Sequence, residues 1–551
     1  MKARSCLAWS AAVVLGSSGI ASADMQGTGE SGGWEKRVAV EPDPSKVVVP
    51  DGYEVGIFVK GLGAPSSATI DGDGNLWVVV APPLLGSPEA DQFEEAHVKV
   101  YDPQGQLINE IGKGTFTSNV MNEISYCAEN GKVYIPEYAE KIWEIDGADG
   151  ELKVAVKDLM SGDHRNGGVT CRDGYLYFAL GLPSNTGFAD PDNHGWTDVP
   201  NDPFWVKHDS EGWGTTPHDA PCRDLVHTGL NVRSSDGRLT GAWLPVGVPA
   251  EPGMKIPAKV PCHGSVMRVA LDQQGTDGNY AHESMEVYAF GFRNQSGVEF
   301  GPEGSRFENA LAVSDNGAND LGNRRIANGA EKIWLVTEMG QDAGYPDKEG
   351  FLFVSGKRYG WTHYQGNPIE RPHPNLYIGE EPFVPTIWPY KFQHHVAGVR
   401  GVPLTIANPN PDGYINPILE WDTNNPIDGI AWSATGFGKD AHLFGAVYGI
   451  LDTGPESLVP TWPAVLDVEF LEPSGIKWSY FARNIEMGPN AYQKPENRGG
   501  LERPNDVVFS NDGRIMYIVD YGEVYTDFEM PSPFYTVPQS GVIWTVTRTG
   551  G

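Results

Sequence analysis

A chain of 551 residues is long enough for a large core, and repetitive all-β folds of this length often form a single unit. Its formal net charge of −32 argues against nucleic-acid binding, because that affinity depends on cationic contacts to phosphate. No segment approaches the ~18–20 uninterrupted apolar residues of a membrane-spanning helix. We therefore expect no nucleic-acid partner and no membrane span.

The N-terminus reads as a secretory signal. Lys2 and Arg4 supply the positive region, a short apolar stretch follows, and "ASA" before Asp24 is a small-residue cleavage site. We expect a signal peptide over 1–23, a flexible polar segment over 24–46, and a periplasmic or secreted protein.

Four cysteines remain after cleavage, and an even number in an exported protein predicts up to two disulfides with three possible pairings. Cys222 and Cys262 each follow a proline and flank one long irregular segment. This favours the pairs 222–262 and 127–171. Metal binding is the weaker alternative, because no CxxC or HExxH spacing occurs.

From Val47 onward a two-part phrase recurs. The first part is a turn before an alternating strand, at 71–80, 129–137, 172–181 and 511–520. The second is a short strand ending in a bulky residue, at 97–105, 141–150, 265–275, 332–340 and 542–550. No amphipathic helix interrupts them. Radial repetition of this kind predicts an all-β fold, a β-propeller spanning 47–551 as one domain, with long loop insertions at 182–262 and 363–425.

Three loop segments carry polar groups at strand junctions. His164 precedes a strand and has the pKa range of a general base, although a structural histidine is the alternative. Arg293-Asn294 offers a guanidinium and an amide between two apolar runs, either for a ligand or for an interblade salt bridge. The oxygen-rich turn around Gly317 suits Ca²⁺ or is a plain turn.

The order of these segments resembles the soluble quinoprotein glucose/sorbosone dehydrogenase family, six-bladed propellers that oxidise sugars or related alcohols with pyrroloquinoline quinone (PQQ) and Ca²⁺. The resemblance rests on "VPDGYEVGIFVKGLGAPSSATIDGDGNLWVVV", "DLMSGDHRNGGVTCRDGYLYFALG", "EVYAFGFRNQSGVEFGPEG", "SDNG", "YGWTHYQGN" and "RPNDVVFSNDGRIMYIVDYGEVY". It spans roughly residues 47–550, interrupted by the insertions.

The resemblance implies a role for each matching residue. His164 would take the substrate hydroxyl proton, Arg293 would stabilise charge on the quinone oxygen, and Asn294 would orient the cofactor. Arg503 would meet a PQQ carboxylate. The Ca²⁺ turn would be Gly317-Ala318, and Glu331 would support a second, structural calcium.

Two features depart from the family pattern. The calcium turn has Ala318 where relatives often have proline or arginine, and Tyr448 stands where relatives tend to have a histidine. The expected partners are a small sugar or alcohol substrate and a soluble electron acceptor. The alternatives are a Ca²⁺-dependent propeller lactonase and a non-catalytic ligand-binding propeller.

Overall fold

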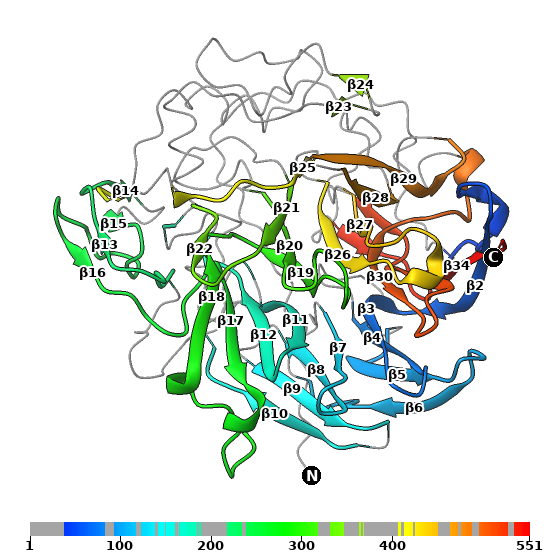
Figure 1. The fold of residues 1–551 in the computed structure, drawn as a ribbon, viewed down its shortest axis with the longest axis horizontal. Coiled ribbons are helices and arrows are strands. Elements are labelled where there is room, and N and C mark those ends of the chain that lie inside the picture. Colours follow the sequence, from blue (N-terminus) through cyan, green and yellow to red (C-terminus); the bar gives the residue numbers. More distant parts are fainter. Residues whose placement is uncertain are drawn as a thin grey trace, which may run out of the picture.

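Six antiparallel sheets surround a common centre in the computed structural model of the chain (Figure 1). The structure describes residues 38–82, 93–116, 123–137, 141–148, 150–159, 164, 166–184, 187–188, 218–233, 239–317, 331–345, 363–364, 367–368, 406–408, 413–421, 425–449, 463–471, 475–486, 495–526 and 534–550. The expected six-bladed, all-β propeller is confirmed. The expected signal peptide lies outside the described residues.

Each blade runs from an inner strand to an outer one. Blades 1 and 2 follow each other along the chain. Blade 1 comprises β3 (Ala64–Ile70), β4 (Leu76–Ala81), β5 (His97–Tyr101) and β6 (Leu107–Ile111). Blade 2 comprises β7 (Ser125–Cys127), β8 (Lys132–Glu137), β9 (Lys141–Asp146) and β10 (Leu152–Val156).

Blades 3 and 4 are each interrupted by an insertion. Blade 3 comprises β11 (Asn166–Arg172), β12 (Tyr175–Leu180), β17 (Ser265–Ala270), β18 (Met285–Phe290) and β22 (Gln341–Asp342). Blade 4 comprises β19 (Gln295–Phe300), β20 (Leu311–Asp315), β21 (Glu331–Val336) and β25 (Leu419–Trp421).

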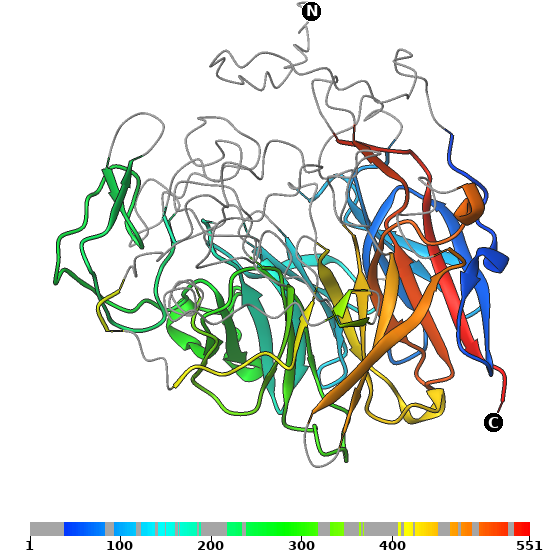
Figure 2. The same cartoon turned by 90° about the horizontal axis from the view of Figure 1, so that it is seen from above.

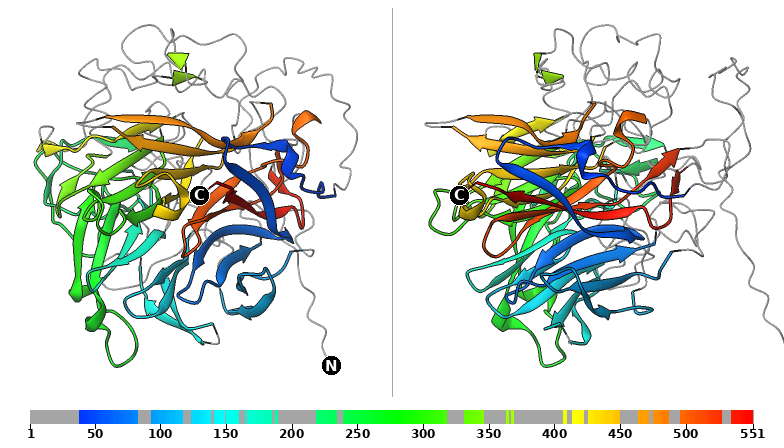
Figure 3. Two further views of the ribbon diagram at one scale, coloured as in Figure 1. Left: turned by 45° about the vertical axis from the view of Figure 1, so that its right-hand side comes forward. Right: turned by 90° about the vertical axis from the view of Figure 1, so that its right-hand side faces the viewer.

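Blades 5 and 6 both include a strand from the N-terminal part of the chain. Blade 5 comprises β26 (Ile427–Trp432), β27 (Leu443–Val447), β28 (Ala464–Phe470), β29 (Ile476–Asn484) and β1 (Val47–Val48). Blade 6 comprises β30 (Pro504–Phe509), β31 (Ile515–Asp520), β34 (Gly541–Arg548) and β2 (Tyr53–Leu62). The antiparallel pairing of β2 with β34 closes the ring (Figure 3).

The insertions form small hairpins outside the blades. The first, between β12 and β17, contains β13 (Leu225–Val226), β14 (Asn231–Arg233), β15 (Leu239–Gly241) and β16 (Lys255–Ile256), which stand apart from the blades in Figure 2. The second, between β21 and β25, contains β23 (His363–Tyr364) and β24 (Asn367–Pro368). A last hairpin pairs β32 (Val524–Thr526) with β33 (Phe534–Thr536).

Helical structure within the described ranges is limited to single 3₁₀ turns. They are η1 (Pro44–Lys46), η3 (Leu271–Gln273), η4 (His282–Ser284), η7 (Thr435–Phe437) and η8 (Pro495–Asn497). None of the helices described is long and apolar enough to cross a membrane.

In the part of the chain that the structure describes, no hydrogen-bonded ladder joins neighbouring blades, and side chains connect their inner strands instead. The hydroxyl of Ser67 donates to Asp506 Oδ2 at 2.7 Å and accepts from the N–H of Ile124 at 3.2 Å, which links blades 6, 1 and 2. Glu123 Oε2 accepts from the N–H of Val169 at 3.0 Å and so links blades 2 and 3. Buried carboxylates thus hold the ring together at its centre.

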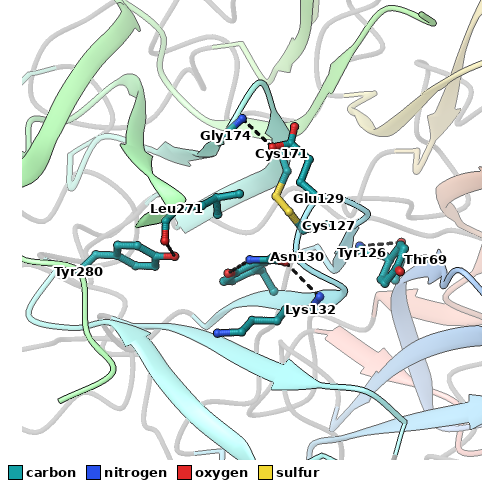
Figure 4. The surroundings of a disulfide bond; sticks show 11 residues. Thr69, Tyr126, Cys127, Glu129, Asn130, Lys132, Cys171, Gly174, Leu271 and Tyr280 are labelled. Carbon is teal, nitrogen blue, oxygen red and sulfur yellow. Dashed lines mark hydrogen bonds between the residues drawn. A yellow bond between two sulfur atoms is a disulfide. The ribbon is translucent and has the colours of Figure 1, made fainter. Parts of the chain in front are cut away.

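Both disulfides match the favoured pairing. Cys127 on β7 bonds to Cys171 on β11 and ties blade 2 to blade 3, beside the hydrogen bond from the Gly174 N–H to Glu129 (Figure 4). Cys222–Cys262 closes the base of the first insertion. The predicted pairing of the four cysteines is therefore confirmed.

Glu299 provides a test of the buried interblade carboxyls. Its Oε2 accepts from the N–H of Trp432 at 2.7 Å across the boundary between blades 4 and 5. Burial raises the pKa of Glu299 to about 8, against the lowering effect of that hydrogen bond. A raised folded-state pKa gives stability that is complete at acid pH and is lost as the pH rises through that value.

The free energy of unfolding of the wild type should therefore fall between about pH 5 and pH 8. Glutamine does not titrate, so in Glu299→Gln this fall should be smaller by about 2–4 kcal/mol. Chemical denaturation at several pH values measures this. The exposed Glu303→Gln is the matched control and should leave the profile unchanged. Identical slopes for wild type and Glu299→Gln would contradict the prediction.

Candidate functional site

Residues at the entrances of four inner strands lie at one end of the propeller. In blades 4 to 6 the carbonyl of the residue directly before the inner strand accepts from the N–H of the residue directly after the second strand, at 2.9–3.0 Å. In blade 3 the N–H of His164, two residues before β11, donates to the carbonyl of Leu182, two residues after β12, at 3.1 Å. The pairs are His164 with Leu182, Asn294 with Asn316, Pro426 with Tyr448, and Arg503 with Tyr521. Because inner strands β11, β19, β26 and β30 surround the centre in Figure 1, these positions form one mouth. Three of the expected site residues therefore lie around it.

His164 is held in one tautomer. Its Nδ1 lies 2.8 Å from the carbonyl oxygen of Leu182, and its backbone N–H donates to the same oxygen. A carbonyl can only accept, so Nδ1 carries the proton and Nε2 carries the lone pair in the neutral ring. The side chain is 5% exposed. This is the arrangement that a general base acting through Nε2 requires.

Leu182 also connects the histidine to the arginine. Its N–H donates to the carbonyl oxygen of Arg293 at 2.9 Å. This bond joins blades 3 and 4 at the mouth. The buried guanidinium of Arg293 donates from Nη1 to the Asn316 carbonyl at 3.2 Å. The structure thus brings His164, Arg293 and Asn294 to adjoining segments.

A tryptophan and a carboxylate fix the backbone of Arg293 and Asn294. Asp315, the last residue of β20, accepts at Oδ1 from the N–H of Arg293 at 3.0 Å and of Asn294 at 2.8 Å. Its Oδ2 accepts from Trp334 Nε1 at 3.3 Å. We call this three-part arrangement the tryptophan–carboxylate clamp.

Blade 6 repeats the clamp around Arg503. Asp520, the last residue of β31, accepts from the N–H of Arg503 at 2.7 Å and from that of Glu502 at 2.9 Å. Trp544 Nε1 donates to the same carboxylate at 3.1 Å. The same local geometry therefore positions both expected arginine segments.

Arg503 is fully buried in a polar cluster. Its Nη1 donates to the Tyr448 carbonyl at 3.3 Å, and its guanidinium lies 5.1 Å from the centroid of the Tyr448 ring. Burial, with the charges of Glu523 and Asp520, raises the pKa of neighbouring Glu502 well above its usual value. Tyr448 thus packs against Arg503, one of the expected cofactor-binding residues.

Gly317 and Glu331 lie together, as expected for a calcium-supporting turn. The Gly317 N–H donates to Glu331 Oε2 at 2.7 Å. Burial raises the pKa of Glu331 to about 8, against that hydrogen bond and the positive charges of Lys332 and Arg293. Ala318, the other expected metal position, lies outside the described residues. The pair therefore places a carboxyl beside the guanidinium of Arg293.

Sequence reasoning missed Asn425. It directly precedes Pro426, in the place that Arg293 takes before Asn294, and its side chain is fully buried. Neither amide atom finds a hydrogen-bond partner among the described residues. Buried amides are normally satisfied, so this one indicates a polar ligand at the mouth. Aligning the segments before β19 and β26 would have identified it.

The first insertion packs behind this site. The N–H of Phe292 donates to the Gly264 carbonyl at 3.0 Å, and a cavity of about 40 Å³ separates Leu182 and Phe292 from Trp243 and His263. That volume holds about two or three water molecules, far less than a sugar. The insertion therefore forms a wall of the site.

No protein-family model matches this sequence, and no curated protein matches it. Solved structures do. The PQQ domain of pyranose dehydrogenase from Coprinopsis cinerea is 14% identical with a TM-score of 0.50, covering 92% of this chain and 98% of that chain. The calcium structure of a family AA12 carbohydrate-active enzyme from Trichoderma reesei is 14% identical with a TM-score of 0.50, covering 94% and 99%. The likeness is one of fold.

The apo form of the soluble aldose sugar dehydrogenase from Escherichia coli also matches, with 11% identity, a TM-score of 0.45, and coverage of 90% of this chain and 99% of that chain. At such identities the two likenesses with a TM-score of 0.50 concern the fold alone. The chemistry has to be argued from the residues at the mouth of the propeller.

Trp334→Phe tests the clamp. It removes the donor to a buried carboxylate oxygen of Asp315, so the free energy of unfolding should fall by about 1–3 kcal/mol. Denaturant unfolding measures the change. Trp478→Phe, on outer strand β29, is the control and should cost less. Equal losses in the two variants would show that only ring packing was removed.

Proposed function

We propose that this protein is an exported quinoprotein dehydrogenase that oxidises a sugar, or a related alcohol or aldehyde, with PQQ and Ca²⁺. The observation that carries the proposal is the placement of His164, Asn294 and Arg503 at the entrances of three inner strands around one mouth, with Arg293 beside them. The fold likeness to a PQQ domain and to a calcium-containing carbohydrate-active enzyme supports it.

The donor set at the mouth fits the cofactor. PQQ carries three carboxylates, and planar guanidiniums such as those of Arg293 and Arg503 match carboxylates well. The amide of Asn425, without a partner among the described residues, adds a donor and an acceptor. Glu331 and the Gly317 turn offer the oxygen atoms that Ca²⁺ prefers.

When bound, PQQ would accept the hydride, with Ca²⁺ polarising it. His164 Nε2 takes the proton from the substrate hydroxyl, which makes that carbon a better hydride donor. The Leu182 carbonyl, already bonded to the Nδ1 proton, stabilises the imidazolium that results. Arg293 supplies positive charge where negative charge develops on the acceptor.

The surroundings of the site fit a small substrate, and we propose a soluble electron acceptor for the reduced cofactor. The first insertion lies against the segments of His164 and Arg293, so its residues would select the substrate. Two disulfides suit a periplasmic or secreted protein, as does the expected signal peptide over 1–23.

His164→Gln should lower the rate of dye reduction with PQQ, Ca²⁺ and a sugar by about 10²–10⁴-fold, because the proton acceptor is lost. PQQ affinity, measured by spectroscopic titration, should change little. His282→Gln, a surface histidine of η4, is the matched control and should keep full activity. The experiment first requires a panel of aldoses and alcohols to find a substrate.

Three results would contradict the proposal. The first is that PQQ does not bind at saturating concentration with Ca²⁺ present. The second is that His164→Gln retains the wild-type rate. The third is that the protein hydrolyses lactones without any quinone. Arg503→Gln separates cofactor binding from catalysis, since it should weaken PQQ binding while leaving the pH profile of the remaining activity unchanged.

A further inference from the structure

Blade 1, which contributes none of the mouth residues named above, carries a buried histidine that faces two carboxylates. His97 begins β5 and is fully buried. Its Nε2 lies 3.1 Å from Glu94 Oε2 and 3.3 Å from Glu110 Oε1. Glu94 precedes β5, and Glu110 lies on outer strand β6. One nitrogen and two oxygens thus converge within 4.8 Å of one another.

The tautomer of His97 aims a lone pair at this cluster. Nδ1 lies 2.6 Å from the carbonyl oxygen of Glu95, which can only accept, so the neutral ring carries its proton on Nδ1. A backbone carbonyl on Nδ1 is the usual support for a histidine that binds a metal through Nε2. Nε2 completes no hydrogen bond with any described residue, although it is buried.

The separations of the two carboxylate oxygens from Nε2 are those of neighbouring metal ligands. A tetrahedral ion with bonds of about 2.0–2.1 Å holds neighbouring ligand atoms about 3.3 Å apart. The two separations from Nε2, 3.1 and 3.3 Å, match this value. Neither carboxylate meets the geometry of a hydrogen bond with Nε2. The position between the three atoms is therefore suited to a cation.

Lys99 competes for the same oxygens. Its Nζ lies 2.9 Å from Glu94 Oε2 and 3.4 Å from Glu110 Oε1. The ammonium therefore balances the two carboxylates when no ion is bound and must move when one binds. Its four-carbon stem has enough rotatable bonds for the ammonium to make that movement.

We propose that His97, Glu94 and Glu110 form a binding site for a divalent transition-metal ion of the zinc class, with Lys99 as its built-in competitor. One imidazole and two carboxylates suit Zn²⁺ or Cu²⁺, whereas Ca²⁺ prefers oxygen ligands throughout. The site is separate from the Ca²⁺ proposed at the mouth.

The site faces the seam at which the ring closes. Tyr101, on the same face of β5 as His97, packs in one apolar cluster with Tyr517 and Ile543 of blade 6. Blade 6 is completed by β2, the N-terminal strand. An ion that clamps β5 to β6 would therefore stabilise blade 1 where it meets the closing blade.

Calorimetric titration of the chelator-treated mature protein with Zn²⁺ tests the site. We expect one equivalent of binding and a rise of about 2–5 °C in Tm at saturation. His97→Gln and Glu94→Gln should each weaken the affinity by about 100-fold or more. Lys99→Met should strengthen it by about tenfold, because a competing charge is removed. Cu²⁺ bound in place of Zn²⁺ should show coupling to one nitrogen by electron paramagnetic resonance.

Either of two results would overturn the proposal. One is Zn²⁺ binding that survives both Glu94→Gln and His97→Gln, which would place the ion elsewhere. The other is a wild type that binds no Zn²⁺, which would leave the cluster as an ion pair. Glu94 is 43% exposed in its side chain, so its variant stays folded if His97→Gln does not. His282→Gln is the control for surface histidines and should bind as the wild type does.

Discussion

The tryptophan–carboxylate clamp is the interaction on which the mouth depends. A polar segment at a strand entrance would be mobile if its backbone N–H groups met only water. Asp315 and Asp520 instead bind those groups from the end of the adjacent second strand. A tryptophan on the third strand then fixes each carboxylate. The indole belongs to the blade core, so packing of the core determines where Arg293 and Arg503 lie.

The clamp explains the phrases that recur in the sequence. The turn-plus-strand phrase is the second strand of blades 1, 2, 3 and 6, and the second phrase is the third strand of blades 1, 2, 3, 4 and 6. The repeat is therefore the middle hairpin of a blade. Its tryptophan recurs at 143, 334 and 544 because each donates to a carboxylate at the end of the second strand.

The fold was predictable for a reason that does not extend to the site. Middle strands are buried on both faces, so their apolar patterns are strong. Inner strands such as β3 and β30 carry a serine and a carboxylate that bond between blades, and the recurring phrases do not include these strands. Asn425 and His97 were missed because their importance lies in what surrounds them in space. The roles of His164 and Arg503 came from family resemblance, and the structure adds their shared position.

The pairing of β2 with β34 has a consequence for synthesis of the protein. Strands 53–62 and 541–548 lie at opposite ends of the chain, so blade 6 and the backbone bonds around Arg503 form last. Until then β2 has an exposed edge and the ring is open. Assembly of the mouth is thereby delayed until the whole polypeptide has been made, and a prematurely terminated chain cannot bind through it.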